Sequence, residues 1–468
     1  MSSGDVGVSE DWEKLAGEEG EDVVTGRWRR AWKLGSMGAR VGASSLMSKV
    51  GSVLRPGDEE QREEALQKAF EKNAARAAEV LGQLKGASMK IGQLMSADPE
   101  FLPDEFSSVL TSLQRDAPPM TYLTVKDQIE EALDRPLETI FTTFDPEPLG
   151  SASLGQVHRA TLEDGSDVAV KVQYPGVAEA LDSDLKTVKS ALIYARVVAS
   201  KKRLDSYLQE IRQALNEELD YENEAHNLER FQSILAQRDH VRAPKPYLKW
   251  TRQTVLVMEY MEGQKLDEAL SEIEQGPRRQ EIMERWVSLF SWMFHEKMQL
   301  HADPHPGNFL LADDDTLVLL DFGSVKDFEA EFTDGFLDIL DACWQDDRNR
   351  AVEAMLDVGF GGDDLSADDL DADLLAEYNA IVLEPFLQNE PFDFSTWAPA
   401  RDGKMFMMRH PSFFRLMPPS DALPYMRVLS GVKGLLSKLN ARINVAQPAI
   451  ETARRRGRLT GEPVIFDR

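Results

Sequence analysis

Three oxygen-bearing side chains are spaced for phosphate chemistry in the segment 301–323, HADPHPGNFLLADDDTLVLLDFG. Asp303 and Asn308 lie on one Pro-stiffened stretch, and Asp321 follows at the end of an apolar run. The pattern predicts a loop, a hairpin and then a metal ligand. Mg²⁺ takes oxygen ligands and usually shares them with substrate phosphates, so we expect Asn308 and Asp321 to bind the metal of an Mg-nucleotide and Asp303 to face the phosphate acceptor. The alternative is a Pro-rich turn followed by a chance D-F-G, and the D-x-x-x-x-N spacing ahead of it argues against chance.

A second group of residues suits phosphate binding in the segment 148–172. Residues 155–162 and 168–172 predict a β-hairpin about the turn Asp164-Gly165, preceded by small residues that would let backbone N–H groups approach phosphates. In the returning strand Lys171 faces away from the valines and would contact the α and β phosphates; an exposed strand lysine is the alternative. The predicted nucleotide-binding residues of this hairpin are Gly150, Ser151, Ala152, Ser153, Gly155, Val157 and Lys171.

A phosphate-binding lysine needs a carboxylate to hold it. The helix predicted from about Asp205 to Ala236 offers Glu218 and Glu224, and Glu224 is the favoured partner of Lys171; an acid-rich, solvated helix face is the alternative. Residues 255–260 predict a strand that leads into a hinge at Met261, Glu262 and Gly263, where an adenine would hydrogen-bond the backbone. Glu259, in that strand, is a further predicted nucleotide-binding residue.

A long amphipathic helix is predicted over residues 59–97, because apolar side chains recur there at three and four residues. Within it the motif K-x-G-Q places Lys90 and Gln93 on one face. Taken alone, this motif is typical of a solvated helix face.

Composition and charge narrow the class of protein. The chain has 468 residues, 42% of them hydrophobic, and can form two or three domains with a substantial core. Its single cysteine, Cys343, excludes an intramolecular disulfide framework and a Cys-based zinc cluster, and we expect a buried, small hydrophobe there. With no apolar run of spanning length and no signal peptide, we expect a cytoplasmic protein, soluble or peripheral at a membrane.

The net charge of −28 is unevenly distributed. Residues 1–22 carry eight acids and one lysine and predict a disordered tail, whereas residues 23–57 carry seven Lys or Arg and no acid. The basic segment is either an amphipathic anchor for anionic lipid or a helix that docks on the acidic body. A body this acidic repels nucleic acid, which we therefore exclude as the main partner.

In combination the motifs resemble the UbiB family of atypical kinases, also called the AarF-domain or ADCK family, over about residues 60–445. The nearest branch is the one linked to coenzyme Q biosynthesis. The motifs that carry the resemblance are K-x-G-Q at 90–93, S-A-S-L-G-Q-V-H at 151–158, V-A-V-K-V-Q-Y-P-G at 168–176, E-L-D-Y-E-N-E at 218–224, H-A-D-P-H-P-G-N, L-L-D-F-G and E-P-F-D-F at 390–394.

The resemblance implies an α+β, bilobed protein-kinase-like fold with an N-terminal helical extension, a mostly helical C-lobe, and ATP and Mg²⁺ as cofactors. The implied domains are an acidic tail (1–22), a basic amphipathic segment (23–57), the K-x-G-Q extension (58–140), an N-lobe (141–263), a C-lobe (264–445) and a C-terminal tail (446–468).

The resemblance also implies roles for single residues. Lys171 would pair with Glu224, Asn308 and Asp321 would bind the metal, and Asp303 would occupy the catalytic-base position. Lys90 would reach over the nucleotide to Glu218, with Gln93 facing the same site, so that the K-x-G-Q helices cover the groove used for peptides in protein kinases.

The expected activity is that of an ATPase or phosphotransferase supporting quinone or isoprenoid-lipid metabolism, and protein kinase activity is not expected. An isoprenoid phenol or quinone precursor and an anionic membrane are the expected partners besides ATP. A nucleotide-binding pseudokinase scaffold and a small-molecule kinase are the alternatives.

Four departures from the protein-kinase and family patterns matter. Ala302 stands where protein kinases have the arginine of H-R-D, and no A-P-E follows Asp321 at the usual distance, which argues against an activation loop switched by phosphorylation. Gly150 and Ser151 stand where some family members have alanines, which leaves the nucleotide preference open. The membrane-spanning segments of some members have no counterpart in this sequence.

Overall fold

The computed structural model describes residues 119–152, 154–195, 201–362 and 365–467, which divide into two compact units. The first unit contains the described residues up to His226 together with Lys245–Tyr260, and the second contains Asn227–Pro244 and the chain from Met261 onward. The segments predicted at 1–22 and 23–57 lie outside the described residues, as does most of 58–140 with Lys90 and Gln93.

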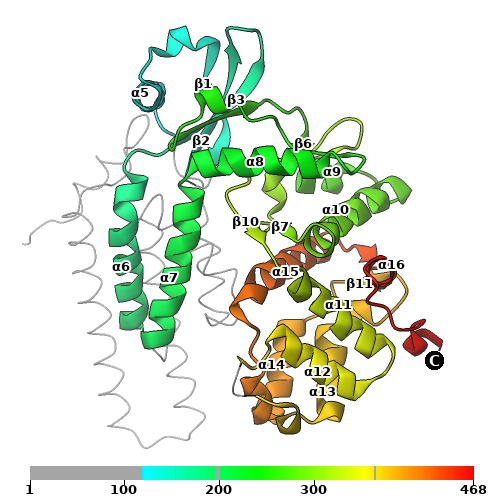
Figure 1. Cartoon of the computed structure of the whole chain (residues 1–468). Helices are drawn as coiled ribbons and strands as arrows, with labels where there is room; N and C mark the ends of the chain where they lie inside the picture. The colour runs from blue at the N-terminus through cyan, green and yellow to red at the C-terminus, as the bar shows by residue number, and fades with distance from the viewer. Residues whose placement is uncertain (1–118, 153, 196–200, 363–364, 468) are drawn as a thin grey trace, which may run out of the picture. The chain divides into compact units, whose positions relative to one another are not determined.

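The first unit is built on an antiparallel sheet of four strands in the order β1-β2-β3-β5, the first three of which are labelled in Figure 1. Its elements are α5 (Tyr122–Leu133), η2 (Leu137–Thr139), β1 (Phe141–Ala152), β2 (Gly155–Leu162), β3 (Asp167–Gln173), α6 (Val177–Ala195), α7 (Lys201–Glu218), the start of α8 (Tyr221–Leu235), η3 (Leu248–Trp250) and β5 (Val255–Glu259). The predicted hairpin is confirmed, with Gly165 in the left-handed region at φ 83° in the turn between β2 and β3.

The core of this unit lies between α5 and the sheet. Val125, Ile129 and Leu133 recur every four residues along α5 and are buried with Val168, Val170 and Val172, the alternate residues of β3. The sequence assigned α5 to the K-x-G-Q extension. In the structure, the apolar face of this helix packs on the sheet of the first unit.

One predicted helix, 205–236, is two helices in the structure. α7 ends at Glu218 and α8 begins at Tyr221, and α6 and α7 run side by side (Figure 1). The chain breaks there because remote groups bind its backbone: Gln173 Nε2 donates to the carbonyl of Leu219 at 2.6 Å, and the Tyr221 amide donates to Gln253 at 3.2 Å.

The small residues before the hairpin are strand rather than loop. Gly150, Ser151 and Ala152 end β1 and pair with Val157, Gln156 and Gly155 of β2. A side chain at Gly155 would overlap the Val172 carbonyl and come within 3.0 Å of Gln173 Cα, so only glycine fits there. At Gly150, by contrast, an added Cβ would meet nothing within 4 Å.

The second unit is mostly helical, with small sheets. The strand order β4-β9-β8-β6 forms one sheet, and β10 with β7 and β11 with β12 form two antiparallel pairs. After the end of α8, its elements up to residue 327 are β4 (Val241–Arg242), β6 (Gln264–Lys265), α9 (Leu266–Glu272), α10 (Pro277–His295), β7 (Gln299–His301), η4 (Pro306–Asn308), β8 (Phe309–Leu311), β9 (Leu317–Leu319) and β10 (Val325–Asp327). After these come α11 (Ala330–Trp344), α12 (Arg348–Val358), η6 (Ala367–Asp369), α13 (Ala372–Val382), η7 (Glu384–Phe386), β11 (Phe392–Asp393), α14 (Pro399–Arg409), η8 (Pro411–Arg415), η9 (Ser420–Ala422), α15 (Leu423–Lys438), β12 (Arg442–Ile443), α16 (Ala446–Arg455) and η10 (Val464–Asp467).

The C-terminal residues 446–468 were predicted as a tail, and the structure corrects this. α16 buries Ala449, Ile450 and Ala453 against α11. Beyond it, Arg456 donates to both oxygens of Asp334 at 2.9 and 3.0 Å. The acidic face of α11 binds the end of the chain, so these residues belong to the second unit.

Two further expectations concern Cys343 and membrane-spanning segments. The Cys343 side chain is partly rather than fully buried, and its surroundings raise the pKa of the thiol to about 11 by desolvation. Among the helices of the described ranges, none is long and apolar enough to cross a membrane.

Candidate active site

The first unit holds Lys171 and Glu224 in a buried ion pair. Lys171 Nζ lies 2.9 Å from both Glu224 oxygens, and the two residues are 5% and 1% exposed. Lys171 Nζ also lies 4.8 Å from the ring centroid of Tyr221. A buried pair of opposite charges is costly to desolvate, so good geometry of this kind points to a functional rather than a stabilising role.

Three predicted nucleotide-binding residues share one face of the sheet. Val157 of β2 lies directly opposite Lys171 of β3, and Gly150 of β1 lies opposite Val157. Directly paired residues of antiparallel strands point to the same side. The side of the sheet that carries the charged pair is therefore also the side lined by Gly150 and Val157.

Glu259 ends β5 at the predicted hinge. Its amide donates to the Lys245 carbonyl at 2.8 Å, and its carboxylate accepts from the Lys245 amide at 3.1 Å. A contact of Glu259 with an adenine would therefore use its backbone carbonyl rather than its amide.

The Gln-Val-His part of the S-A-S-L-G-Q-V-H motif has a structural explanation that sequence reasoning missed. Gln156 and His158 are buried, and Gln156 accepts from the Met120 amide at 2.6 Å while its Nε2 lies 2.7 Å from His158 Nε2. His158 Nδ1 donates to the Asp145 carbonyl. Its Nε2 accepts from Gln156 Nε2, which requires a neutral ring, and burial lowers the pKa of His158. These side chains fasten β1 and the chain before α5 to β2.

In the second unit the predicted catalytic loop connects β7 to the hairpin β8–β9. Asp303 Oδ1 accepts from the His305 amide at 3.2 Å, and His305 Nδ1 accepts from the Gly307 amide at 3.1 Å, where it caps η4. These turns hold Asp303 half-buried at the start of the loop and Asn308 at its end.

Asn308 and Asp321 are brought next to each other by the hairpin. Phe309 pairs with Leu319, and the Leu320 amide donates to the Asn308 carbonyl at 3.0 Å. Asp321 Oδ1 accepts from the Gly323 amide at 3.0 Å, which fixes its carboxylate in the turn. One amide and one carboxylate are hard oxygen donors of the kind Mg²⁺ prefers, so these residues fit a magnesium ion that completes its shell with phosphate and water. Across the described ranges, no three His, Cys, Asp or Glu side chains gather as a metal site of their own.

Two residues that the sequence analysis did not single out hold the loop of Asp321. His301 is fully buried, and its Nε2 donates to the Asp321 carbonyl. Asn227 of α8 donates to the Phe322 carbonyl at 3.1 Å. The position of His301 directly before the Asp303 loop was a usable signal, whereas Asn227 is too far away in the sequence to have been found.

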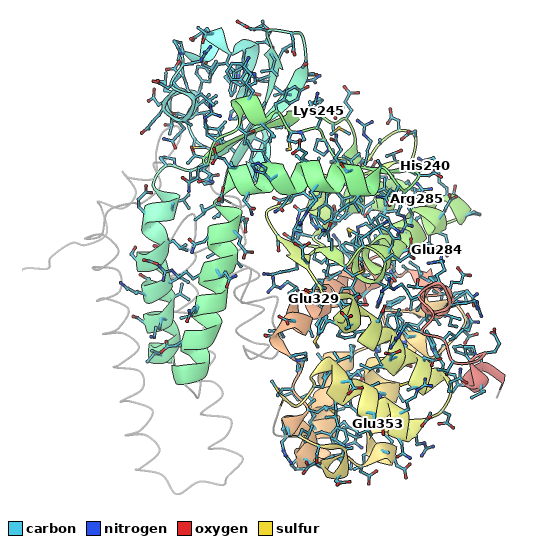
Figure 2. The ribbon with its side chains drawn as sticks, viewed as in Figure 1. His240, Lys245, Glu284, Arg285, Glu329 and Glu353 are labelled. Atoms are coloured by element: carbon cyan, nitrogen blue, oxygen red, sulfur yellow. The ribbon has the colours of Figure 1, made fainter. Side chains whose placement is uncertain are left out.

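Helices α15 and α10 support the loop and the hairpin. Gly431 of α15 lies against Pro304, so closely that an added Cβ would overlap the proline ring. From α10, Arg278 donates to both oxygens of Asp315, and Arg285 donates to the Asp315 carbonyl at 2.5 Å (Figure 2 shows Arg285 on α10). The Arg278 guanidinium holds the pKa of Asp315 below its ordinary value.

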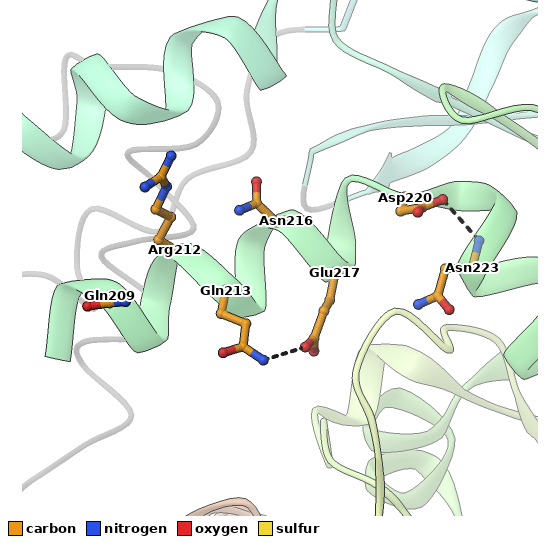
Figure 3. Close-up of a pocket in the computed structure, with 7 residues that line it drawn as sticks. All are labelled: Gln209, Arg212, Gln213, Asn216, Glu217, Asp220 and Asn223. Atoms are coloured by element: carbon orange, nitrogen blue, oxygen red, sulfur yellow. Dashed lines mark hydrogen bonds between the residues drawn. The ribbon is translucent and has the colours of Figure 1, made fainter. Parts of the chain in front are cut away.

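A surface depression lies along α7 and the start of α8 (Figure 3), next in sequence to Glu218 at the end of α7. The described residues that line it are all polar: Gln209, Arg212, Gln213, Asn216, Glu217, Asp220 and Asn223. Adenine sites need apolar walls, so this depression does not suit a nucleotide base. Ser153 and the residues that would face Glu218 from the K-x-G-Q helices lie outside the described ranges.

The chain is similar in sequence to known proteins. Residues 112–355 match the family model described as the ABC1 atypical kinase-like domain. The atypical kinase COQ8B of Rattus norvegicus is 30% identical over 90% of this chain and 79% of its own length. The atypical kinase coq-8 of Caenorhabditis elegans is 30% identical over 80% of this chain, but the match spans only 50% of that protein's length.

A solved structure agrees with these matches. The Mycobacterium tuberculosis protein Rv3197, determined in complex with erythromycin, is 26% identical with a TM-score of 0.59, covering 84% of this chain and 98% of the other. The predicted kinase-like fold of mixed helices and sheets is thereby confirmed.

Proposed function

Because this chain belongs to the ABC1 atypical kinase-like family, as its motifs predicted, we propose that it binds Mg-ATP and hydrolyses or transfers the γ-phosphate. The observation that carries the proposal is the buried Lys171–Glu224 pair, on the same face of the sheet as Val157 and Gly150. Its cost in desolvation is explained if the ammonium group is held ready for phosphate oxygens.

The residues have separate tasks in this reaction. Lys171, oriented by Glu224, binds phosphate oxygens. Asn308 and Asp321 would hold Mg²⁺, which neutralises phosphate charge as the transition state forms. Asp303 orients the attacking oxygen of water or an acceptor hydroxyl: the new bond forms to the γ-phosphorus, the bond to the β,γ-bridging oxygen breaks, ADP leaves, and the proton passes to the Asp303 carboxylate.

The acceptor in this proposal is water or a molecule of a lipid pathway rather than a protein. The support is the sequence of the K-x-G-Q segment, where Lys90 and Gln93 are expected over the nucleotide, with Lys90 directed at Glu218. The relatives named COQ8 favour a role in coenzyme Q or related isoprenoid-quinone metabolism. Attachment to an anionic membrane through residues 23–57 belongs to the same proposal.

ATP turnover tests the proposal, measured with and without an isoprenoid phenol, anionic liposomes and a mixed peptide library. We expect Mg²⁺-dependent ADP release that the phenol or the liposomes increase, with no phosphate on the peptides. Nucleotide binding without any turnover would instead indicate a pseudokinase scaffold, and phosphate recovered on the phenol would indicate a small-molecule kinase.

Membrane attachment has its own test. Deletion of residues 1–57 is expected to reduce co-flotation of the chain with anionic liposomes. Unchanged flotation would reject the basic segment as the anchor.

A further inference from the structure

An exposed, methionine-rich surface lies on α14 and the residues that follow it in the second unit. Met405, Met408, Phe414 and Met417 are 50%, 66%, 51% and 44% exposed. Single exposed apolar residues are ordinary, but four large ones within thirteen consecutive residues are typical of an interaction surface. We call these four side chains, together with Lys404 and Arg409, the Met-rich surface.

α14 has two distinct faces. Its inner face buries Gly403 and Phe406, and an added Cβ at Gly403 would lie 3.5 Å from Tyr378 and 3.6 Å from Val382 of α13. Met405 and Met408 lie three residues apart on the opposite face, so packing within the unit does not use them. Their exposure follows from the helical periodicity and is not a consequence of a poorly packed helix.

Basic side chains surround the exposed methionines. Lys404 and Arg409 are exposed on α14 and make no ion pair within the described ranges, whereas Arg401 pairs with Asp402 and Arg415 pairs with Asp369. Residues 399–417 contain four Lys or Arg and one Asp, in a chain whose net charge is −28. The segment is therefore a local exception to the acidity of the chain.

We propose that the Met-rich surface binds an anionic lipid membrane. Apolar side chains that project from one helix face can enter the boundary between headgroups and acyl chains, while lysine and arginine meet lipid phosphates. Because the chain as a whole carries a net charge of −28, an anionic membrane attracts it only through local basic segments, and residues 399–417 are one of these. The surface is separate from residues 23–57 and does not depend on the proposed phosphate chemistry.

Flotation of the full-length chain tests this assignment, on phosphatidylcholine vesicles with and without phosphatidylglycerol. The double variant Met405→Ser/Met408→Ser is expected to lower the vesicle-bound to free ratio about 10-fold or more on the anionic vesicles. Lys404→Glu/Arg409→Glu is expected to lower it about 10-fold on anionic vesicles and little on neutral ones. The matched control Leu248→Ser/Lys249→Glu changes an exposed apolar and an exposed basic residue of the first unit and should partition like the unchanged chain.

Equal flotation of both test variants and the control, with urea unfolding showing that all are folded, would overturn the assignment. A cross-link from residues 1–22 to α14 would then make the chain's own acidic segment the occupant. ATP turnover measured without vesicles is expected to be the same in all these variants, so a failure here is distinct from a failure of the proposed activity.

Discussion

Substitution of Gly431 by alanine tests whether α15 sets the position of the catalytic loop. The new Cβ would overlap Pro304 Cγ and lie 3.3 Å from Pro304 Cβ, where ordinary contacts are 3.4–4 Å. Relief of the overlap takes a shift of about 1 Å, and a misplacement of that size at a reacting group costs about 100-fold in rate. Asp303 directly precedes Pro304, so we expect ATP turnover to fall by about 10- to 100-fold.

The stability of this variant is expected to change much less than its activity. Overpacking costs about 1–3 kcal/mol, but replacing glycine by alanine inside a helix returns about 1 kcal/mol. Gly434→Ala is the matched control on the same helix, because an added Cβ there meets nothing within 4 Å. It should raise the free energy of unfolding by about 1 kcal/mol and leave turnover unchanged. Equal turnover of the Gly431 and Gly434 variants, with urea unfolding showing that both are folded, would show that α15 does not set the position of the catalytic loop.

Three further predictions concern buried groups. Lys171→Met removes the ammonium group from the buried Glu224 carboxylate and should lower the free energy of unfolding, measured in urea, by about 3–5 kcal/mol. The double variant with Glu224→Leu should recover most of that stability but should not recover ATP binding. A Lys171→Met variant as stable as the parent would contradict this prediction. Gly155→Ala should lower the free energy of unfolding by about 3 kcal/mol, because its Cβ clashes with the backbone of β3. Gly150→Ala should be as stable as the parent, since its Cβ meets nothing within 4 Å. Equal melting temperatures of the two variants would count against the strand geometry. Burial lowers the pKa of His295 to about 4, so between that value and its ordinary 6.5 the unfolded chain binds more protons, and the free energy of unfolding should fall by about 2 kcal/mol from pH 7.5 to pH 5. His295→Asn keeps one N–H donor and should remove this contribution to the pH dependence of the free energy of unfolding. An unchanged pH dependence in this variant would exclude His295 as its source.

Local patterns were sufficient to predict the hairpins and which candidate residues lie on them. The alternation of valines in 168–172 fixes which way Lys171 points, and the Asp-Gly turn fixes the pairing that sets Val157 opposite it. The apolar run before Asp321 likewise predicted the strand that pairs with β8 beside Asn308. Such features depend on neighbours in the sequence, which a pattern can show.

Features that depend on remote residues could not be predicted in this way. The break between α7 and α8 needs Gln173 and the Gln253 carbonyl, which bind backbone that would otherwise continue as helix. The end of the chain looks like a tail until Arg456 is placed beside Asp334 of α11. The role of Gly431 follows only from its contact with Pro304. In each case the residue that determines the local structure lies far away in the sequence.

The most direct test of the account is calorimetric titration of ATP into the chain and into Asp321→Asn, with and without Mg²⁺. Asparagine keeps an oxygen that can accept from the Gly323 amide, so the turn should persist while the charged metal ligand is lost. Asp313→Asn, an exposed carboxylate in the same hairpin, is the control. We predict that Mg²⁺ strengthens ATP binding to the parent and the control, that this strengthening is absent from Asp321→Asn, and that its turnover falls by at least about 100-fold. Mg²⁺-dependent binding and turnover in Asp321→Asn equal to those of the control would contradict the assignment of the site.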